Sequence, residues 1–120
     1  MDNQIVWVDM PVVDLDRAIS FYSAVLGNEV KKEAYEGCAF GLLPHANTNV
    51  SGCLIEVDES KITKAGPLLY FNVNGRIEAA TEQAIAHGGS VDEPFMDMGA
   101  HGKRVVVIDS EGNRIALHSE

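Results

Sequence analysis

The chain has 120 residues, the length of one ordinary domain. Because 46% of the residues are hydrophobic and 22% are charged, the composition is that of a globular protein and excludes a disordered or fibrous one. Nine Lys and Arg residues against 18 Asp and Glu residues give a net charge of −9, which repels nucleic acid and anionic lipid. We therefore expect neutral or cationic partners, with no nucleic acid and no membrane among them.

Two features of the sequence predict the compartment. The apolar runs are far shorter than the ~20 residues that cross a bilayer, and the first residues lack the basic and apolar regions of a signal peptide. The two cysteines, Cys38 and Cys53, form no Cys-x-x-Cys pair, and we expect both to be small, buried, reduced residues. These features predict a cytoplasmic protein.

The first half of the chain predicts a strand, a helix and up to three further strands. Residues 5–13 alternate, with even-numbered apolar side chains facing the core and Trp7 and Asp9 on the other face, which is the pattern of a half-buried strand. Asp14 is placed to cap a helix whose apolar residues recur at helical spacing until Gly27 ends it. The remaining predictions are strands at 39–43 and 50–57, joined by a loop at 44–49.

The second half repeats this order. A strand is predicted at 68–73, Asn74 is a candidate helix cap, and a helix with Ile77, Ala80 and Ala84 on its apolar face stops at Gly88-Gly89. A closing hairpin is predicted from strands at 104–108 and 114–118 across the turn 109–113.

The two halves superimpose without a gap when the first is shifted by 61 residues. The shift places Val12 on Val73 and Gly27 on Gly88. Because the order of predicted elements also matches, the sequence indicates one structural unit used twice. A single domain is expected, with one module at about 4–57, a solvated connector at about 58–66 and a second module at about 67–119.

The motifs at the two ends carry a family resemblance. The run VVDLDRAISFY at residues 12–22, followed by Val25-Leu26-Gly27, resembles the opening of the glyoxalase, bleomycin-resistance and extradiol-dioxygenase superfamily, also called vicinal oxygen chelate proteins. The run DSEGNRIAL at 109–117 is similar to the last hairpin of that superfamily. The resemblance implies an α+β fold of two βαβββ modules, whose curved mixed sheet forms a cup with helices outside. It also implies a homodimer.

The resemblance gives positions at which metal-dependent members hold a divalent ion. Three of them correspond to Trp7, Leu68 and Ala116, and the fourth lies near Ser51 to Cys53. Imidazole and carboxylate groups are the ligands such ions need, and an indole, an isobutyl group and a methyl group cannot replace them. The expectation is therefore a cup without a metal or other cofactor.

Other polar residues are predicted to lie in the same cup. Asp9, Tyr70, Asn72 and His118 are each an even number of residues from one of the three metal positions, so they should share its strand face. Together they give the predicted ligand-binding set, which is Trp7, Asp9, Leu68, Tyr70, Asn72, Ala116 and His118. The weak candidates for acid–base catalysis are Asp9, Tyr70 and His101, the last in a glycine-flanked segment.

Three functions follow from this reading. The first is a glyoxalase-like protein that binds a small molecule, aromatic or cationic, without a catalytic metal. The second is a metal-dependent or acid–base enzyme of the same superfamily, such as a lyase, an isomerase or a dioxygenase. The third is a non-catalytic dimeric interaction module. A ligand-sized cavity beside Trp7 would distinguish the first from the third, since function depends on the site rather than the fold.

Overall fold

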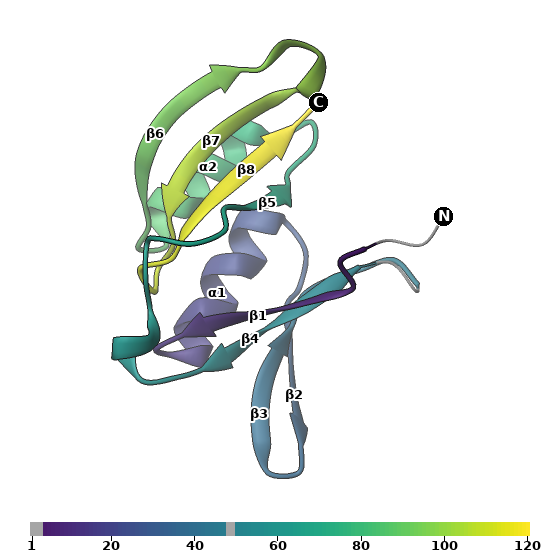
Figure 1. Ribbon diagram of the computed structural model, residues 1–120, viewed down its shortest axis with the longest axis vertical. Coiled ribbons are helices and arrows are strands. Elements are labelled where there is room, and N and C mark those ends of the chain that lie inside the picture. Colours follow the sequence, from purple (N-terminus) through teal and green to yellow (C-terminus); the bar gives the residue numbers. More distant parts are fainter. Residues whose placement is uncertain (1–3, 48–49) are drawn as a thin grey trace.

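The computed structural model describes residues 4–47 and 50–120, and it contains two modules of the same design (Figure 1). In the first module, β1 is parallel to β4, and the strand order is β1-β4-β3-β2. Its elements are β1 (Trp7–Val12), α1 (Leu15–Leu26), β2 (Lys31–Tyr35), β3 (Cys38–Leu42) and β4 (Ser51–Glu56).

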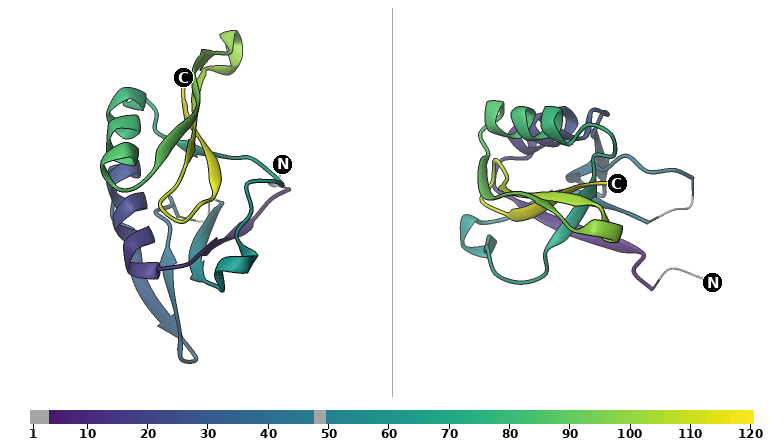
Figure 2. Two further views of the ribbon diagram at one scale, coloured as in Figure 1. Left: turned by 90° about the vertical axis from the view of Figure 1, so that its left-hand side faces the viewer. Right: turned by 90° about the horizontal axis from the view of Figure 1, so that it is seen from above.

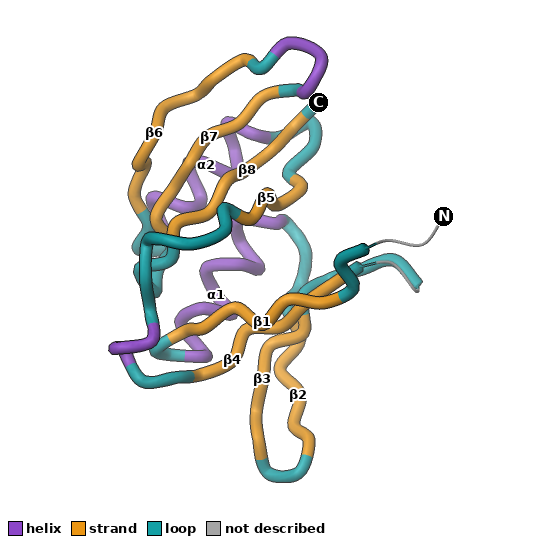
Figure 3. The backbone as a smooth tube through the Cα atoms, in the orientation of Figure 1, coloured by secondary structure: helices purple, strands orange, loops and turns teal. Residues whose placement is uncertain are grey.

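The second module has the same arrangement, with β5 parallel to β8 and the order β5-β8-β7-β6. Its elements are β5 (Leu69–Asn72), α2 (Ile77–Ala86), β6 (Ser90–Asp97), β7 (Lys103–Ile108) and β8 (Arg114–Ser119). Short 3-10 helices lie in the connector, at Glu59–Lys61, and in the β6–β7 turn, at Gly99–His101 (Figure 3). The predicted α+β class and the two βαβββ modules are confirmed.

The mixed sheet is divided into two four-stranded sheets. Among the described residues, β1 pairs only with β4 and β5 only with β8, so each is an edge strand that faces the other module without joining it. Both helices lie on one side of the two sheets (Figure 2). Each sheet therefore has one face covered by helices and one face that we call its open face. No described helix is long and apolar enough to span a membrane.

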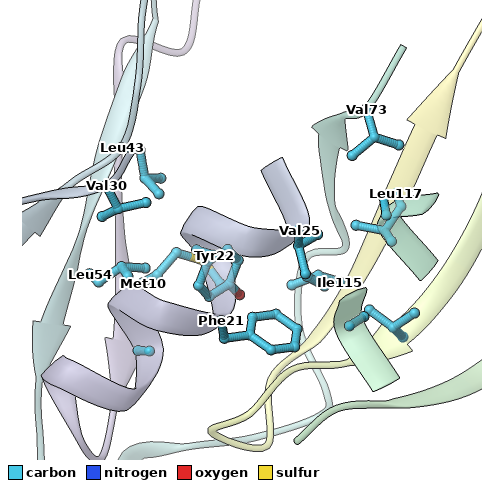
Figure 4. Packing of buried hydrophobic residues seen from close by; sticks show 14 of the residues in the cluster. Met10, Phe21, Tyr22, Val25, Val30, Leu43, Leu54, Val73, Ile115 and Leu117 are labelled. Atoms are coloured by element: carbon cyan, nitrogen blue, oxygen red, sulfur yellow. The ribbon is translucent and has the colours of Figure 1, made fainter. Parts of the chain in front are cut away.

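The core forms around α1, which both modules contact (Figure 4). Tyr22 is fully buried and packs against Phe21 of its own helix and Phe71 of β5, with ring centroids 5.0 and 5.3 Å apart. The hydroxyl of Tyr22 donates a 2.5 Å hydrogen bond to Asp109 in the β7–β8 turn. Because burial of aromatic side chains is a major source of packing energy, this contact holds the two modules against each other.

The first helix begins and ends as predicted, but the second does not begin at the predicted cap. Asp14 accepts a hydrogen bond from Arg17 N at 3.1 Å, and Gly27 ends α1 with φ 65°. The N-cap of α2 is Arg76, which caps without its side chain, so the prediction for Asn74 is wrong. The Asn74 side-chain oxygen instead accepts from Glu120 N at 2.8 Å, which ties the end of the chain to the β5–α2 turn.

Two strands and one cysteine also differ from the predictions. No strand is predicted from the sequence at 31–35 or at 90–97, where β2 and β6 form the outer edge of each sheet. Every residue of β2 is exposed, so its sequence lacks the alternation that marks a half-buried strand. Cys53 is buried as predicted, whereas Cys38 is exposed, and both thiols are free. The last two residues of the loop predicted at 44–49 lie outside the described residues.

Candidate functional site

A cavity of about 670 Å³ lies where the first module faces the edge strand β5. Cavities of about 300–1,000 Å³ with a mostly apolar lining are typical of small-molecule sites. Apolar side chains from both modules line it, among them Val8, Leu26, Leu43, Leu69 and Phe71. The cavity is therefore built by the junction of the two modules rather than by either module alone.

Five polar side chains also line the cavity, and most are already held by the protein. Tyr70 accepts a 2.5 Å hydrogen bond from Arg104 Nη1, Ser51 Oγ donates to the Leu43 carbonyl at 3.1 Å, and Asn72 Oδ1 accepts from Asn74 N at 2.8 Å. These contacts leave the Tyr70 hydroxyl proton and the Asn72 amide protons as donors for a ligand. The other two polar residues are Asn28 and His45.

Trp7, Asp9 and Cys53 form a hydrogen-bonded group on the open face of the first sheet. Asp9 Oδ1 accepts from Trp7 Nε1 at 2.9 Å and from Cys53 Sγ at 3.3 Å. Asp9 and Cys53 are direct partners in the parallel β1–β4 pair, which explains why their side chains meet. Burial, together with the hydrogen bond to Asp9, raises the pKa of the Cys53 thiol to about 11. Cys53 is therefore a protonated donor at neutral pH and not a nucleophile.

A ladder of ion pairs covers the open face of the second sheet. Arg104 contacts Glu93 at 3.2 Å, and Arg114 contacts both Glu93 and Asp92, the latter at 2.8 Å. Beneath these side chains lie Val106 and Ala116, both fully buried. Arg104 also lies over the Tyr70 ring, 5.9 Å from its centroid, so the ladder extends to the cavity wall.

The strand pairing places the predicted residues of the second module on one face. Tyr70 is opposite Ala116 and Asn72 is opposite His118, as the even spacing required. Tyr70 and Asn72 line the cavity, and Leu68 is half-buried just before β5. Ala116 and His118 are not among the cavity-lining residues.

The remaining predicted residues lie apart from the cavity. Trp7 and Asp9 occupy the opposite face of β1 from Val8, which lines it. His101 is exposed in the β6–β7 turn, where its carbonyl oxygen lies 2.7 Å from His118 Nε2. The three catalytic candidates, Asp9, Tyr70 and His101, thus have different partners, and the chain does not bring them together.

Several residues at the site were not predicted from the sequence. His45 and Leu43 come from the loop between β3 and β4, and Phe71 belongs to the helix-facing side of β5. Ser51 was noted only as one end of the uncertain fourth metal position, and it is the strand partner of Trp7. The sequence predicted a loop at 44–49, which contributes to this side of the cavity. A loop pattern does not show which strand edge the loop approaches, so the contact with β5 could not be predicted.

Three of the four positions at which the family resemblance places a metal ligand do not fit one here. They present an indole at Trp7, an isobutyl group at Leu68 and a methyl group at Ala116, none of which has a donor atom for a divalent ion. Among residues 4–47 and 50–120, no three His, Cys, Asp or Glu side chains come close enough together to hold a metal ion. We therefore derive no chemistry through a metal.

Comparison with family models shows which family the chain belongs to. Residues 4–117 match the family model of the Glyoxalase/Bleomycin resistance protein/Dioxygenase superfamily. The chain belongs to this superfamily. A glyoxalase/bleomycin resistance protein from Albidiferax ferrireducens T118 has a similar structure, with a TM-score of 0.69 and 24% identity, covering 98% of this chain and 100% of that one. A comparison with curated proteins finds no match.

Other members of the superfamily share the fold at lower identity. A family enzyme from Burkholderia phytofirmans PsJN has a TM-score of 0.70 and 17% identity, covering 94% of this chain and 95% of that one. A variant of the fosfomycin resistance protein FosX from Listeria monocytogenes, solved with Mn(II) and 1S,2S-dihydroxypropylphosphonic acid, has a TM-score of 0.71 and 17% identity. It covers 98% of this chain and 90% of that one. At such identities the likeness concerns the fold alone.

Proposed function

We propose that this glyoxalase-superfamily chain binds a small molecule in the cavity between its modules, without a catalytic metal. The observation that carries the proposal is the cavity of about 670 Å³, which is lined by apolar side chains from both modules together with five polar ones. A lining of this kind provides apolar contact area for affinity and a few hydrogen bonds for orientation. The side chains at the metal positions, Trp7, Leu68 and Ala116, support binding rather than metal-assisted chemistry.

The lining favours a neutral aromatic ligand over a cationic one. No Asp, Glu, Lys or Arg side chain of the described residues lines the cavity, so a buried charge on the ligand would lack an opposite charge. Phe71 and Tyr70 provide aromatic surface, and the Asn72 amide supplies hydrogen-bond donors for a ligand oxygen.

Neutral and cationic aromatic probes of similar size test this site. We expect indole and 2-naphthol to shift the amide NMR signals of Leu43, His45, Ala46 and residues 69–72, and tryptamine to do so more weakly. Ala46 is small, exposed and part of the lining, so Ala46→Trp should fill the cavity and weaken binding about tenfold or more. Ala100→Trp is the matched control, because Ala100 is exposed in the distant β6–β7 turn. Equal binding by the two variants would exclude the cavity as the site.

We also propose that the chain is a cytoplasmic homodimer. Among the described residues β1 and β5 each pair with one strand only, and Trp7 and Tyr70 are 47% and 48% exposed, which leaves strand edges and aromatic surface that a second copy could cover. Light scattering is expected to give twice the chain mass of 13.0 kDa. A monomer at all concentrations would contradict this proposal. The exposed free thiol of Cys38 supports a reducing compartment.

A further inference from the structure

A second hollow, of about 530 Å³, lies on the helix side of the second module between α2 and the edge strand β6. It does not share residues with the cavity between the modules. We call it the α2–β6 groove. Its apolar surface consists of Ile77, Val91, Pro94, Phe95 and Val105.

The irregularity of β6 creates the groove. Its pairing with β7 shifts register between Val91 and Glu93 and again between Glu93 and Met96. Extra residues at such bulges change the alternation of side chains and bend a strand. As a result Val91, Pro94 and Phe95 all line the groove, although α2 does not cover them. Val91 remains 42% exposed and Phe95 53% exposed, so this apolar wall is in contact with solvent.

The polar rim of the groove is negative. Glu78 and Glu82 lie one turn apart on α2 and both line the groove, and within the described part of the chain neither forms an ion pair. Like charges at this spacing destabilise a helix by a few tenths of a kcal/mol. The third polar residue, Thr81, uses its hydroxyl proton in a 2.8 Å hydrogen bond to the Ile77 carbonyl. The rim therefore offers only oxygen acceptors, two of them charged.

The other charges of β6 do not neutralise this rim. Asp92 and Glu93 are also acidic, and they are paired with Arg114 and Arg104 on the open face of the sheet. The nearest guanidinium along the chain, that of Arg76, is held at the end of α1 by a 2.6 Å hydrogen bond to the Val25 carbonyl.

We propose that the α2–β6 groove binds small amphipathic cations, with the apolar body against Val91 and Phe95 and the ammonium group beside Glu78 and Glu82. The apolar wall gives the contact area, and the unpaired carboxylates select a positive charge. Since the carboxylates are exposed, each contributes modestly, and the affinity falls as salt screens the charges. The net charge of −9 raises the local concentration of such ligands.

Three probes with the same ring and different charges test the proposal by NMR titration. At pH 7 we expect 2-phenylethylamine to shift the amide signals of residues 77–82, residues 91–93 and Phe95. The neutral analogue 2-phenylethanol should bind about three- to tenfold more weakly, and phenylacetate should not bind measurably. Raising the ionic strength should weaken the amine and leave the alcohol unchanged. Amine and alcohol binding equally would overturn the proposal.

Matched variants separate the local rim from the general charge of the protein. The double variant Glu78→Gln, Glu82→Gln should bring the affinity for the amine down to that for the alcohol. The control Glu29→Gln, Glu59→Gln removes the same charge from exposed positions of the first module and the connector and should have little effect. Equal losses in the two double variants would show that only net charge matters and would refute the site.

Two further variants distinguish binding in the groove from binding in the cavity between the modules. Phe95→Ala should weaken the amine and the alcohol by the same factor, because it removes the shared apolar wall, whereas Ala46→Trp should change neither. If the groove signals instead shift with protein concentration in the absence of a probe, a second copy of the chain covers the groove, and the proposal fails.

Discussion

At the scale of single residues, the two cysteines differ in their exposure to solvent. Cys53 is 6% exposed and donates to Asp9, and burial raises its pKa to about 11, whereas Cys38 is exposed. At pH 8 only about one in a thousand Cys53 thiols is ionised, and the thiolate is the reactive form. The reactivity of the exposed Cys38 thiol and that of the buried Cys53 thiol can therefore be compared within one chain.

We predict that a disulfide reagent such as Ellman's reagent modifies one thiol per native chain rapidly at pH 8. Cys38→Ser should abolish the rapid phase, and Cys53→Ser should leave it unchanged. Both thiols should react rapidly once the chain is unfolded in urea. Rapid modification of two thiols in the native protein would show that the Cys53–Asp9 contact does not protect the thiol.

At the same scale, the sequence indicated some of the site and missed the rest for a physical reason. Even spacing along a strand fixes which side chains share a face, so Tyr70, Asn72 and His118 were placed on one face with Ala116. The partners of Tyr70 were not foreseen, because Arg104 reaches it from a strand 34 residues away. Contacts of this kind depend on how strands are ordered across a sheet, which a period-two pattern does not contain.

At the scale of elements, the β7–β8 turn holds the start of α1 through one buried carboxylate. The Glu111 side chain is fully buried and accepts from the backbone N–H groups of Val13 and Asp14 at 2.8 and 2.7 Å. It also pairs with Arg17 Nε at 2.7 Å. Burial alone would raise the pKa of Glu111, but the hydrogen bonds from Arg17 and the backbone outweigh it and lower the pKa to about 2.

This carboxylate predicts a specific pH dependence of stability. Because the native pKa is about 2 and the ordinary value is 4.5, Glu111 stabilises the fold above about pH 4.5, and the contribution is lost as the pH falls toward 2. The shift corresponds to about 3 kcal/mol at neutral pH. Glu111→Gln should therefore lower the free energy of unfolding in urea by about 2–3 kcal/mol at pH 7 and by much less at pH 2.5. The exposed control Glu59→Gln should show neither effect, and a pH-independent loss in Glu111→Gln would contradict the assigned pKa.

The ends of a helix were predictable where residues at those ends provide the capping hydrogen bonds and backbone conformation themselves. Asp14 and Gly27 bracket α1 because a side-chain cap and a left-handed glycine satisfy the helix ends locally. The start of α2 was not predictable from Asn74, since that side chain is occupied by the chain terminus. The strands β2 and β6 were missed because exposed or bulged edge strands lack a regular apolar alternation.

At the scale of the whole molecule, the internal repeat predicted the two-module architecture correctly. The two proposed binding sites lie where the repeat gives no information, at the junction of the modules and at the bulges of β6. The cavity combines Val8 and Leu43 of the first module with Leu69 and Phe71 of the second. The α2–β6 groove has its origin in the bulges of β6, and no such irregularity occurs in the pairing of β2 with β3. Both proposed binding sites therefore depend on features that the internal repeat does not predict.

The two modules are held together by contacts in the interior and not by the connector between them. Lys61 and Lys64 are exposed in it, whereas the modules are joined across the interior by Tyr22 with Asp109 and by Asn113 with the Pro11 carbonyl at 2.7 Å. Covalent continuity is thus unnecessary once folding is complete. Brief trypsin treatment should nick the chain there and give two fragments that co-elute on size exclusion and separate only in denaturant. Fragments that part spontaneously would mean that the tether, and not the interior, maintains the assembly.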